Sequence, residues 1–290
     1  SNQAKAQKFK DLFEVETTVG YENIFDYDLD CVYIPLPNSL HYFWAYECLK
    51  NNMDIIVEKS LACNYEETIS LINYAKERNL AVLESFQFRF HSCFKTVKES
   101  LDKNEIGDLR VIRTSFGFPP FKNSENIRYK KSLGGGALLD AGAYTTKISQ
   151  LLLGNNLEVA SSNLQYSERY DVDIWGSVTL REKKSKLTSQ MAFGFDNYYQ
   201  NSLEIWGSKG KIFAPRIFTS PPGDSQTVVI ENERGKKEIV TKSENQFISL
   251  LDYFCDNLAR NKDCKDREQE YESNLVQSRI LQEIFLKNEN

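Results

Sequence analysis

Short apolar runs alternate with longer amphipathic stretches in the first third of the chain. The apolar runs are bounded by polar or turn-forming residues, as is typical of buried parallel strands, and lie at 30–35, 54–58 and 79–85. Helical patterns separate them at about 38–51, where Asn38 and Ser39 are expected to cap the helix, and again from Asn64 onward. Strands joined by helices in this order predict βαβ units of an open parallel sheet with right-handed crossovers. A short helix at 2–13 is predicted before the first strand.

After residue 90 the pattern changes from strand–helix alternation to a run of strands. Further elements are predicted as helices at 91–103, about 135–153, 244–260 and 266–287, and as a strand at 109–116. Several period-2 stretches without intervening helices lie between 157 and 242, which is typical of an antiparallel sheet. We therefore predict an α/β chain in two parts. An incomplete dinucleotide-binding domain with a partial Rossmann-type parallel sheet spans 1–87, and an α+β domain with a large, mainly antiparallel open sheet spans 88–290.

Aromatic residues gather in the predicted antiparallel sheet, at Phe193, Phe195, Tyr198, Tyr199 and Trp206. They fit an apolar sheet face that a second subunit covers, which would give a homodimer or homotetramer. They fit equally well a face that packs against the chain's own helices.

Composition narrows the class of protein. The 290 residues carry a net charge of −5, so neither nucleic acid nor an anionic membrane surface is expected as a general partner. No apolar run approaches the roughly 18 residues that a membrane span needs, and the polar start at Ser1–Lys5 lacks the apolar core of a signal peptide. Six cysteines without C-x-x-C spacing indicate reduced thiols and a cytoplasmic location; they are Cys31, Cys48, Cys63, Cys93, Cys255 and Cys264. With only two histidines beside them, no metal site is expected.

The candidate catalytic residues are an upstream lysine and two residues of a glycine-led helix, that is, a helix that three glycines precede. Three glycines at 134–136 run into an apolar stretch that carries Asp140 and, four residues later, Tyr144, so both side chains are expected on one helix face. Lys59 follows the predicted strand at 54–58, at the edge where open parallel sheets bind ligands. An ammonium beside a phenol would lower the phenol's pKa and make it useful as an acid or base. The alternative is that Tyr144 only packs a helix face, that Lys59 is an exposed strand end and that Asp140 is a surface or capping carboxylate.

Three ordered motifs resemble a known family. VYIPLPNSLHYFWAYECLKNNMDIIVEKSLA, FRFHSCFKTVKESLDKNEIGDLRVIRTSFGF and NIRYKKSLGGGALLDAGAY are similar to segments of the Gfo/Idh/MocA oxidoreductases, which include glucose-fructose oxidoreductase and inositol dehydrogenase. The likeness covers most of the chain up to about Gly154 and then weakens. The tyrosine of the third motif resembles the branch of glucose-fructose oxidoreductase and dihydrodiol dehydrogenase.

The resemblance implies an NAD- or NADP-dependent oxidoreductase acting on a sugar, polyol or cyclic diol, with NADP favoured by this branch. Lys59 would touch both nicotinamide ribose and substrate, Tyr144 would donate or accept the proton, and Asp140 would face the substrate. Arg128 would contact a substrate hydroxyl or carboxylate. The nicotinamide end of the cofactor would lie against Pro37, Asn38, His41 and Glu58. From the residues alone, His41 is as readily a first-turn helix residue, and His91 is read as a packed or capping histidine.

Two departures from the family pattern bear on this interpretation. Ser60 stands where the family has a proline after the lysine, which would relax the backbone that aims Lys59. No G-x-G-x-x-G turn is present to bind the pyrophosphate, and Ser1–Lys5 corresponds to a segment just after the family's second strand. We therefore expect either an incomplete version of a longer enzyme or a degenerate member, non-catalytic and acting in binding, regulation or assembly.

Overall fold

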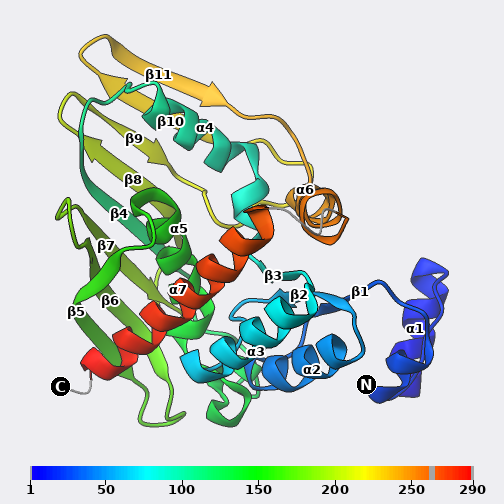
Figure 1. Ribbon diagram of the computed structural model, residues 1–290. Helices are drawn as coiled ribbons and strands as arrows, with labels where there is room; N and C mark the ends of the chain where they lie inside the picture. Colours follow the sequence, from blue (N-terminus) through cyan, green and yellow to red (C-terminus); the bar gives the residue numbers. More distant parts are fainter. Residues whose placement is uncertain (1, 261–264, 289–290) are drawn as a thin grey trace.

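The computed structural model describes residues 2–260 and 265–288 and contains two β-sheets (Figure 1). The smaller sheet is parallel and has the order β1-β2-β3. Its strands are β1 (Cys31–Ile34), β2 (Asp54–Glu58) and β3 (Val82–Ser85). β2 and β3 are buried along almost their whole length, which is why they appear in the sequence as continuous apolar runs. The predicted partial Rossmann-type sheet is therefore present.

Two helices connect the strands of this sheet, α2 (Asn38–Lys50) and α3 (Tyr65–Arg78). α3 begins as its sequence predicts, because the Asn64 side chain accepts a hydrogen bond from the Glu67 N–H. The predicted cap of α2 was wrong. Pro37 is the N-cap residue there, and the Asn38 amide instead donates to the Gly134 carbonyl at 2.8 Å. That bond ties the start of α2 to the glycine-rich segment far along the chain.

The larger sheet has eight strands in the order β11-β10-β9-β8-β4-β7-β6-β5. Its first half along the chain comprises β4 (Leu109–Gly117), β5 (Leu157–Tyr166), β6 (Asp173–Glu182) and β7 (Thr188–Gly194). The second half comprises β8 (Gln200–Gly207), β9 (Gly210–Ala214), β10 (Thr227–Asn232) and β11 (Gly235–Val240). Only the β4–β7 pair is parallel among the described strands of this sheet, so it is mainly antiparallel, as predicted.

The glycine-led helix is interrupted at its start. A π-helical segment (Leu138–Gly142) leads into α5 (Ala143–Leu153), and the predicted helical residues Gly135 and Gly136 are not helical. The φ angles of Gly134 and Gly136, +71° and +117°, explain this, because residues in that region cannot continue a right-handed helix.

Helices pack on one face of the large sheet and continue onto the small one. Figure 1 shows α7 (Lys265–Asn288) running diagonally past both sheets. Its Ile280, Leu281 and Ile284 belong to the core of the large sheet, and its Tyr271 to the core of the small one. The remaining helical elements are α4 (Ser92–Asp102), α6 (Gln246–Tyr253), a π-helical segment (Phe254–Ala259) and short 3₁₀ turns that include Gln87–Phe90, Ile127–Tyr129 and Lys131–Leu133. Because α7 serves both cores, the domain boundary at residue 87 stays a prediction.

The predicted aromatic cluster divides into buried and exposed rings. Phe193 and Phe195 are buried in the core, as expected if the sheet packs on the chain's own helices. Tyr198, Tyr199 and Trp206 are exposed, Tyr198 at 88%. Assembly through this sheet therefore stays a prediction that rests on the three exposed rings alone.

The first helix, α1 (Gln3–Phe13), lies at the periphery of the molecule (Figure 1). It buries no residue, and its Phe9, Leu12 and Phe13 are each about 60% exposed. Within the described part of the chain, no helix is long and apolar enough to cross a membrane. Cys31, Cys48, Cys63, Cys93 and Cys255 are free thiols, while Cys264 lies outside the described residues.

Candidate active site

A cavity of about 160 Å³ opens at the carboxyl ends of β1 and β2, the edge at which parallel sheets bind ligands. Its walls include Pro37 and Asn38, which follow β1, and Glu58 and Lys59 at the end of β2. Residues from the glycine-rich segment, with Arg128 and Asp140, close the opposite side. The fold thus brings together at one cavity six of the eight residues predicted from the sequence. The other two, His41 and Tyr144, lie outside its lining.

Asp140 is the centre of charge in this cavity. Its carboxylate accepts a hydrogen bond from Lys59 Nζ on one oxygen and from Arg128 Nε, at 2.5 Å, on the other. Lys59 also donates to the Asp140 main-chain carbonyl at 3.1 Å. Burial alone would raise the pKa of Asp140, but the charges of Lys59 and Arg128 outweigh burial and hold that pKa below its ordinary value. Asp140 is therefore ionised at neutral pH and fixes both cations at the cavity wall.

Tyr144 lies next to this group inside an aromatic enclosure. Its ring centroid is 5.2 Å from Lys59 Nζ, and its hydroxyl lies 3.1 Å from the Gln87 side-chain nitrogen. Four phenylalanine rings pack around it at centroid distances between 5.2 and 6.0 Å; they are Phe86, Phe88, Phe116 and Phe218.

The predicted lowering of the Tyr144 pKa was wrong for this state of the protein. Burial and the nearby Glu58 carboxylate raise the pKa of Tyr144 well above its ordinary value. The Asp140 carboxylate raises this pKa further, while Arg128 and the hydrogen bond from Gln87 lower it without offsetting the rise. At neutral pH Tyr144 is accordingly a protonated phenol, able to give up a proton only to a strong base.

The segment after Lys59 is held by three hydrogen bonds in place of the family's proline. His41 Nδ1 lies 2.7 Å from the Ser60 carbonyl, the Ser60 hydroxyl donates to the Leu139 carbonyl at 3.3 Å, and the Leu61 N–H donates to a Glu84 carboxylate oxygen at 3.0 Å. These three hydrogen bonds hold the backbone that follows Lys59, although Ser60 stands in place of the proline.

The two histidines have structural surroundings. His41 is fully buried, and its Nε2 lies 2.7 Å from the Leu36 carbonyl, so its ring joins the segment after β1 to the segment after β2. Burial lowers the pKa of His41, although the two carbonyl contacts raise it. His91 caps α4, because its Nδ1 accepts a hydrogen bond from the Cys93 N–H at 3.0 Å. His91 is therefore a capping histidine, as predicted.

Three further residues of the site were not found from the sequence. Gln87 bonds the Tyr144 hydroxyl, and Tyr33 donates to the Glu58 carboxylate at 2.6 Å. Asp173, at the start of β6, accepts from the Leu138 N–H at 2.6 Å and so caps the segment that carries Asp140. Gln87 could have been identified, because it follows β3 at the same sheet edge at which Lys59 follows β2.

The chemical character of the small cavity fits the nicotinamide end of a dinucleotide. It combines apolar proline and leucine walls with one ammonium, one guanidinium, two carboxylates and one carboxamide, at the carboxyl ends of parallel strands. Pro37, Asn38, Glu58 and Lys59 are the residues that could hold that group there. Across the described residues no cluster of three or more His, Cys, Asp or Glu side chains could bind a metal ion.

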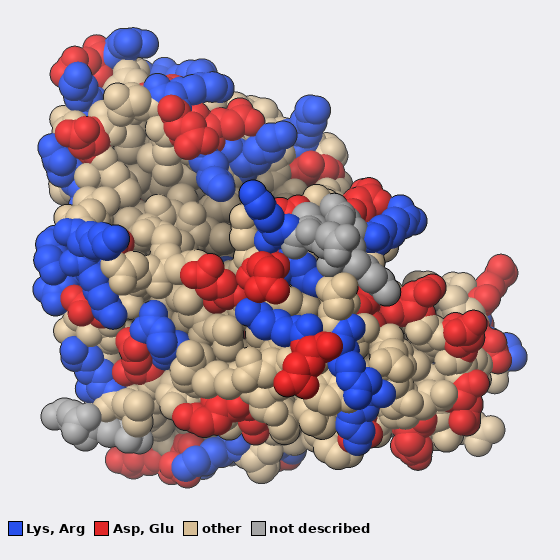
Figure 2. Space-filling view, viewed as in Figure 1, with Lys and Arg blue, Asp and Glu red and all other residues tan. Residues whose placement is uncertain are grey.

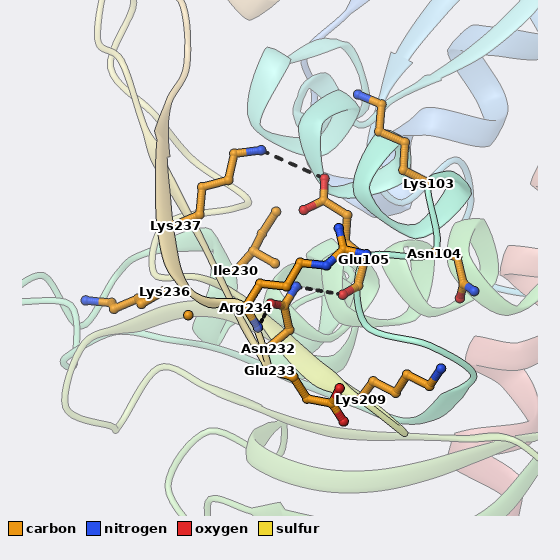
Figure 3. Close-up of a pocket in the computed structure, with 11 residues that line it drawn as sticks. Lys103, Asn104, Glu105, Lys209, Ile230, Asn232, Glu233, Arg234, Lys236 and Lys237 are labelled. Carbon is orange, nitrogen blue, oxygen red and sulfur yellow. Dashed lines mark hydrogen bonds and ion pairs between the residues drawn. The ribbon is translucent and has the colours of Figure 1, made fainter.

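A larger hollow, of about 790 Å³, lies elsewhere, between the end of α4 and the β10–β11 hairpin (Figure 3). Its charged side chains include Lys103, Lys209 and Arg234, and an ion pair of Lys237 with Glu105 crosses one side. None of its lining residues is among those predicted to carry chemistry. Figure 2 shows acidic and basic side chains interspersed over the visible face of the molecule, not gathered into one basic band.

Two family models match the chain in succession. A model of the oxidoreductase family with an NAD-binding Rossmann fold matches residues 1–86, and a model of the GFO/IDH/MocA C-terminal domain matches residues 94–213.

Individual relatives share this architecture. The chain is 34% identical over 245 residues to dTDP-3,4-didehydro-2,6-dideoxy-alpha-D-glucose 3-reductase of Saccharopolyspora spinosa. The matched region covers 84% of this chain and 73% of that protein. It is 27% identical over 242 residues to trans-1,2-dihydrobenzene-1,2-diol dehydrogenase of Xenopus laevis, covering 83% and 71% of the two chains.

A solved structure extends the likeness to the whole fold. The 3-ketoreductase KijD10 from Actinomadura kijaniata, crystallised with NADP and TDP-benzene, superposes with a TM-score of 0.92 at 30% identity, covering 99% of this chain and 87% of that one. Sequence, fold and site geometry lead to one conclusion: the chain belongs to the Gfo/Idh/MocA family of NAD(P)-dependent oxidoreductases.

Proposed function

We propose that this protein reduces the carbonyl group of a sugar-like substrate, and catalyses the reverse oxidation, with Tyr144 as the proton donor and acceptor. One observation carries the proposal. Lys59, held by Asp140 at the cavity wall, lies beside the ring of a buried, protonated Tyr144. A fixed ammonium and a phenol next to a cavity are the groups needed to stabilise and protonate an alkoxide.

The residues would act in sequence on the substrate oxygen. Pro37, Asn38, Glu58 and Lys59 would hold the nicotinamide end of a reduced cofactor, which would supply the hydride and be oxidised in turn. When the carbonyl carbon gains a hydride, its carbon–oxygen π bond breaks and an alkoxide is left, whose charge Lys59 would stabilise. Tyr144 then donates its hydroxyl proton to the alkoxide, and the resulting phenolate keeps its hydrogen bond from Gln87 until solvent returns a proton. Because an alkoxide is a far stronger base than a phenolate, the raised pKa of Tyr144 does not prevent this transfer.

The relatives support the substrate class and the cofactor. Names among them include a reductase of a dTDP-linked deoxysugar, an NADP-dependent D-xylose dehydrogenase and a dihydrodiol dehydrogenase. We therefore propose a sugar or cyclic diol as substrate, a nucleotide-linked keto-sugar first among these, and NADP as the preferred cofactor. Arg128 would bind a substrate oxygen from the cavity rim, where its side chain is about one-third exposed.

The spacing of two substituted positions in one relative is similar to the spacing of Lys59 and Tyr144. Structures of the Actinomadura ketoreductase were solved with one tyrosine changed to phenylalanine and with one lysine changed to alanine or glutamate. Those two positions are almost as far apart along that chain as Lys59 and Tyr144 are along this one.

The test separates cofactor binding from chemistry. NADPH and NADH are titrated by fluorescence, and initial rates are then measured with a dTDP-linked keto-deoxysugar, D-xylose and a trans-dihydrodiol. Tyr144→Phe should lower kcat by about a hundredfold or more while leaving the Kd of NADPH unchanged, because general acid catalysis contributes about 10²–10⁴-fold. Lys59→Met should lower kcat and also weaken NADPH binding.

Tyr271→Phe is the matched control, because it removes the hydroxyl of another buried tyrosine, which donates to the Leu80 carbonyl away from the cavity. Wild-type rates in Tyr144→Phe with any substrate of the panel would contradict the assigned role. NADPH binding without turnover of any substrate would instead favour a non-catalytic family member.

A further inference from the structure

We propose that the buried ion pair of Glu84 and Lys147 is a positioning device that fixes Lys59 relative to Tyr144. Lys147 is fully buried in α5, and Glu84, in β3, is 2% exposed. Glu84 Oε2 lies 3.6 Å from Lys147 Nζ. Neither residue lines the cavity at Lys59, so direct contact with substrate is not their role.

Each partner is connected to one of the two catalytic segments. Glu84 Oε1 accepts the hydrogen bond of the Leu61 N–H, two residues after Lys59. Lys147 lies three residues after Tyr144, and so one turn further along the same helix. The ion pair therefore spans the gap between the strand end that carries Lys59 and the helix that carries Tyr144.

A third group strengthens the link. The Phe86 ring lies 5.2 Å from Lys147 Nζ and packs edge-on against Tyr144 at 5.4 Å between centroids. Lys147 also donates to the Ser273 hydroxyl at 3.0 Å, which anchors it to α7. A buried lysine bound on three sides has little freedom to move, and neither has the helix turn that it belongs to.

Burying two charges costs desolvation free energy, and a protein with hydrophobic residues of similar volume in their place is often equally stable. When the charge of Lys147 is removed, the buried Glu84 carboxylate must be neutralised or must move out of its site. If Glu84 moves, the Leu61 N–H loses its hydrogen-bond acceptor. The inference rests on the roles proposed above for Lys59 and Tyr144, but the state of Leu61 can be measured without any substrate.

Other charged groups also face this pair. Burial lowers the pKa of Lys147 to about 8, against the opposing effect of Glu84, with Arg89 lowering it further and Glu270 raising it. Arg89 and Glu270 form their own ion pair, at 3.0 Å between Nη1 and Oε2. Lys147 should consequently lose its proton as the pH rises through about 8, and Glu84 would then lack its partner.

The experiment measures amide hydrogen exchange of the Lys59–Leu61 segment in the full chain, with β6 as an internal reference. Lys147→Met should speed exchange of the Leu61 amide by about thirtyfold, since the departure of the unpaired Glu84 carboxylate removes a whole hydrogen bond to a charged acceptor. The double variant Glu84→Gln/Lys147→Met has no buried charge and keeps a neutral acceptor for Leu61, so its increase should be limited to about fivefold over the wild type. Lys209→Met, at an exposed lysine, is the matched control.

A second readout uses pH and activity. Protection of Leu61, corrected for intrinsic exchange, should fall between pH 7 and 9 in the wild type and stay constant in the double variant Glu84→Gln/Lys147→Met, because burial also raises the pKa of Glu84 and the double variant has neither titrating group. If the assigned substrate class is correct, kcat should follow the same order as Leu61 protection among the variants while the NADPH Kd changes little. Unchanged Leu61 exchange in Lys147→Met, an equal change in β6, or a double variant no better than the single one would each overturn the inference. Absence of turnover in every variant would refute the proposed function and leave the exchange test intact.

Discussion

The raised pKa of the buried Asp173, which caps the start of the glycine-led helix, can be tested through the pH dependence of stability. Its carboxylate, 2% exposed, accepts from the Leu138 N–H at 2.6 Å and so fixes the start of the segment that carries Asp140. Burial raises the pKa of Asp173 from the ordinary 3.8 to about 6, although the surrounding main-chain N–H groups lower it. Replacement by asparagine removes the charge and keeps the shape.

The sign of the effect follows from proton binding. Between the pKa of the unfolded chain, 3.8, and that of the folded protein, about 6, the folded state holds more protons, so rising pH lowers the free energy of unfolding. A shift of about two pKa units corresponds to about 3 kcal/mol in total. Of this, about 2 kcal/mol should be lost between pH 4.5 and 7.5.

The assay is urea unfolding of the wild type and Asp173→Asn across that pH range. The asparagine also places an amide group near the Ala137 N–H, a loss that does not depend on pH, so the slope and not the offset carries the test. All other carboxyl groups titrate alike in both proteins and cancel in the difference. The stability of the wild type relative to Asp173→Asn should fall by about 2 kcal/mol as the pH rises from 4.5 to 7.5. A difference that stays constant with pH would show that Asp173 is not charged in a buried site.

Three further substitutions probe the surroundings of the site. Gly136→Ala should lower the free energy of unfolding by about 2–4 kcal/mol in urea titrations, because the new Cβ would lie 2.1 Å from the Asp173 carboxylate at a φ of +117°. Gly154→Ala is the control, since Gly154 also has a positive φ but nothing lies within 4 Å of its Cβ position, and it should cost less. Equal losses of stability in the two variants would exclude the clash with Asp173. Gln87→Leu should shift the pH profile of the oxidation rate to higher pH, since the hydrogen bond from Gln87 lowers the pKa of Tyr144; an unmoved profile would contradict this. His41→Leu should weaken NADPH binding in fluorescence titrations by about tenfold, because the segments after β1 and β2 lose their common partner, whereas an unchanged Kd would refute that link.

The elements that the sequence predicts well are those whose burial is uniform along the element. β2 and β3 are buried over almost all their length, and the eight-stranded sheet shows alternating burial, so runs and period-2 patterns identify both. The ends of helices are less predictable, because the residues that bond there can be far away along the chain. Asn38 has the composition of a helix cap, yet its side chain bonds Gly134, 96 residues further along.

The site likewise has features that the sequence predicts and features that depend on distant partners. Lys59, Asp140 and Arg128 meet because strand ends and the glycine-led helix converge, which their motifs and order along the chain predict. The charge state of Tyr144 could not be predicted, since it depends on how many aromatic rings surround it and on which partner takes the Lys59 ammonium. The burial of Lys147 depends on distant segments, since its Nζ lies beside Glu84 of β3 and donates to Ser273 of α7, more than 100 residues later.

Asp140 links these findings in one consequence for catalysis. In the structure it binds Lys59 and Arg128 at once, so it holds the ammonium at the cavity, while its own negative charge raises the pKa of Tyr144. Tyr144 therefore starts each cycle protonated, which suits reduction, where the phenol must give a proton to an alkoxide. Oxidation needs the opposite state, a phenolate, and that state requires either high pH or a substrate hydroxyl that draws Lys59 from Asp140. A site built this way should favour reduction at neutral pH. Its oxidative rate should rise with pH up to the pKa of Tyr144, over a range in which its reductive rate stays constant.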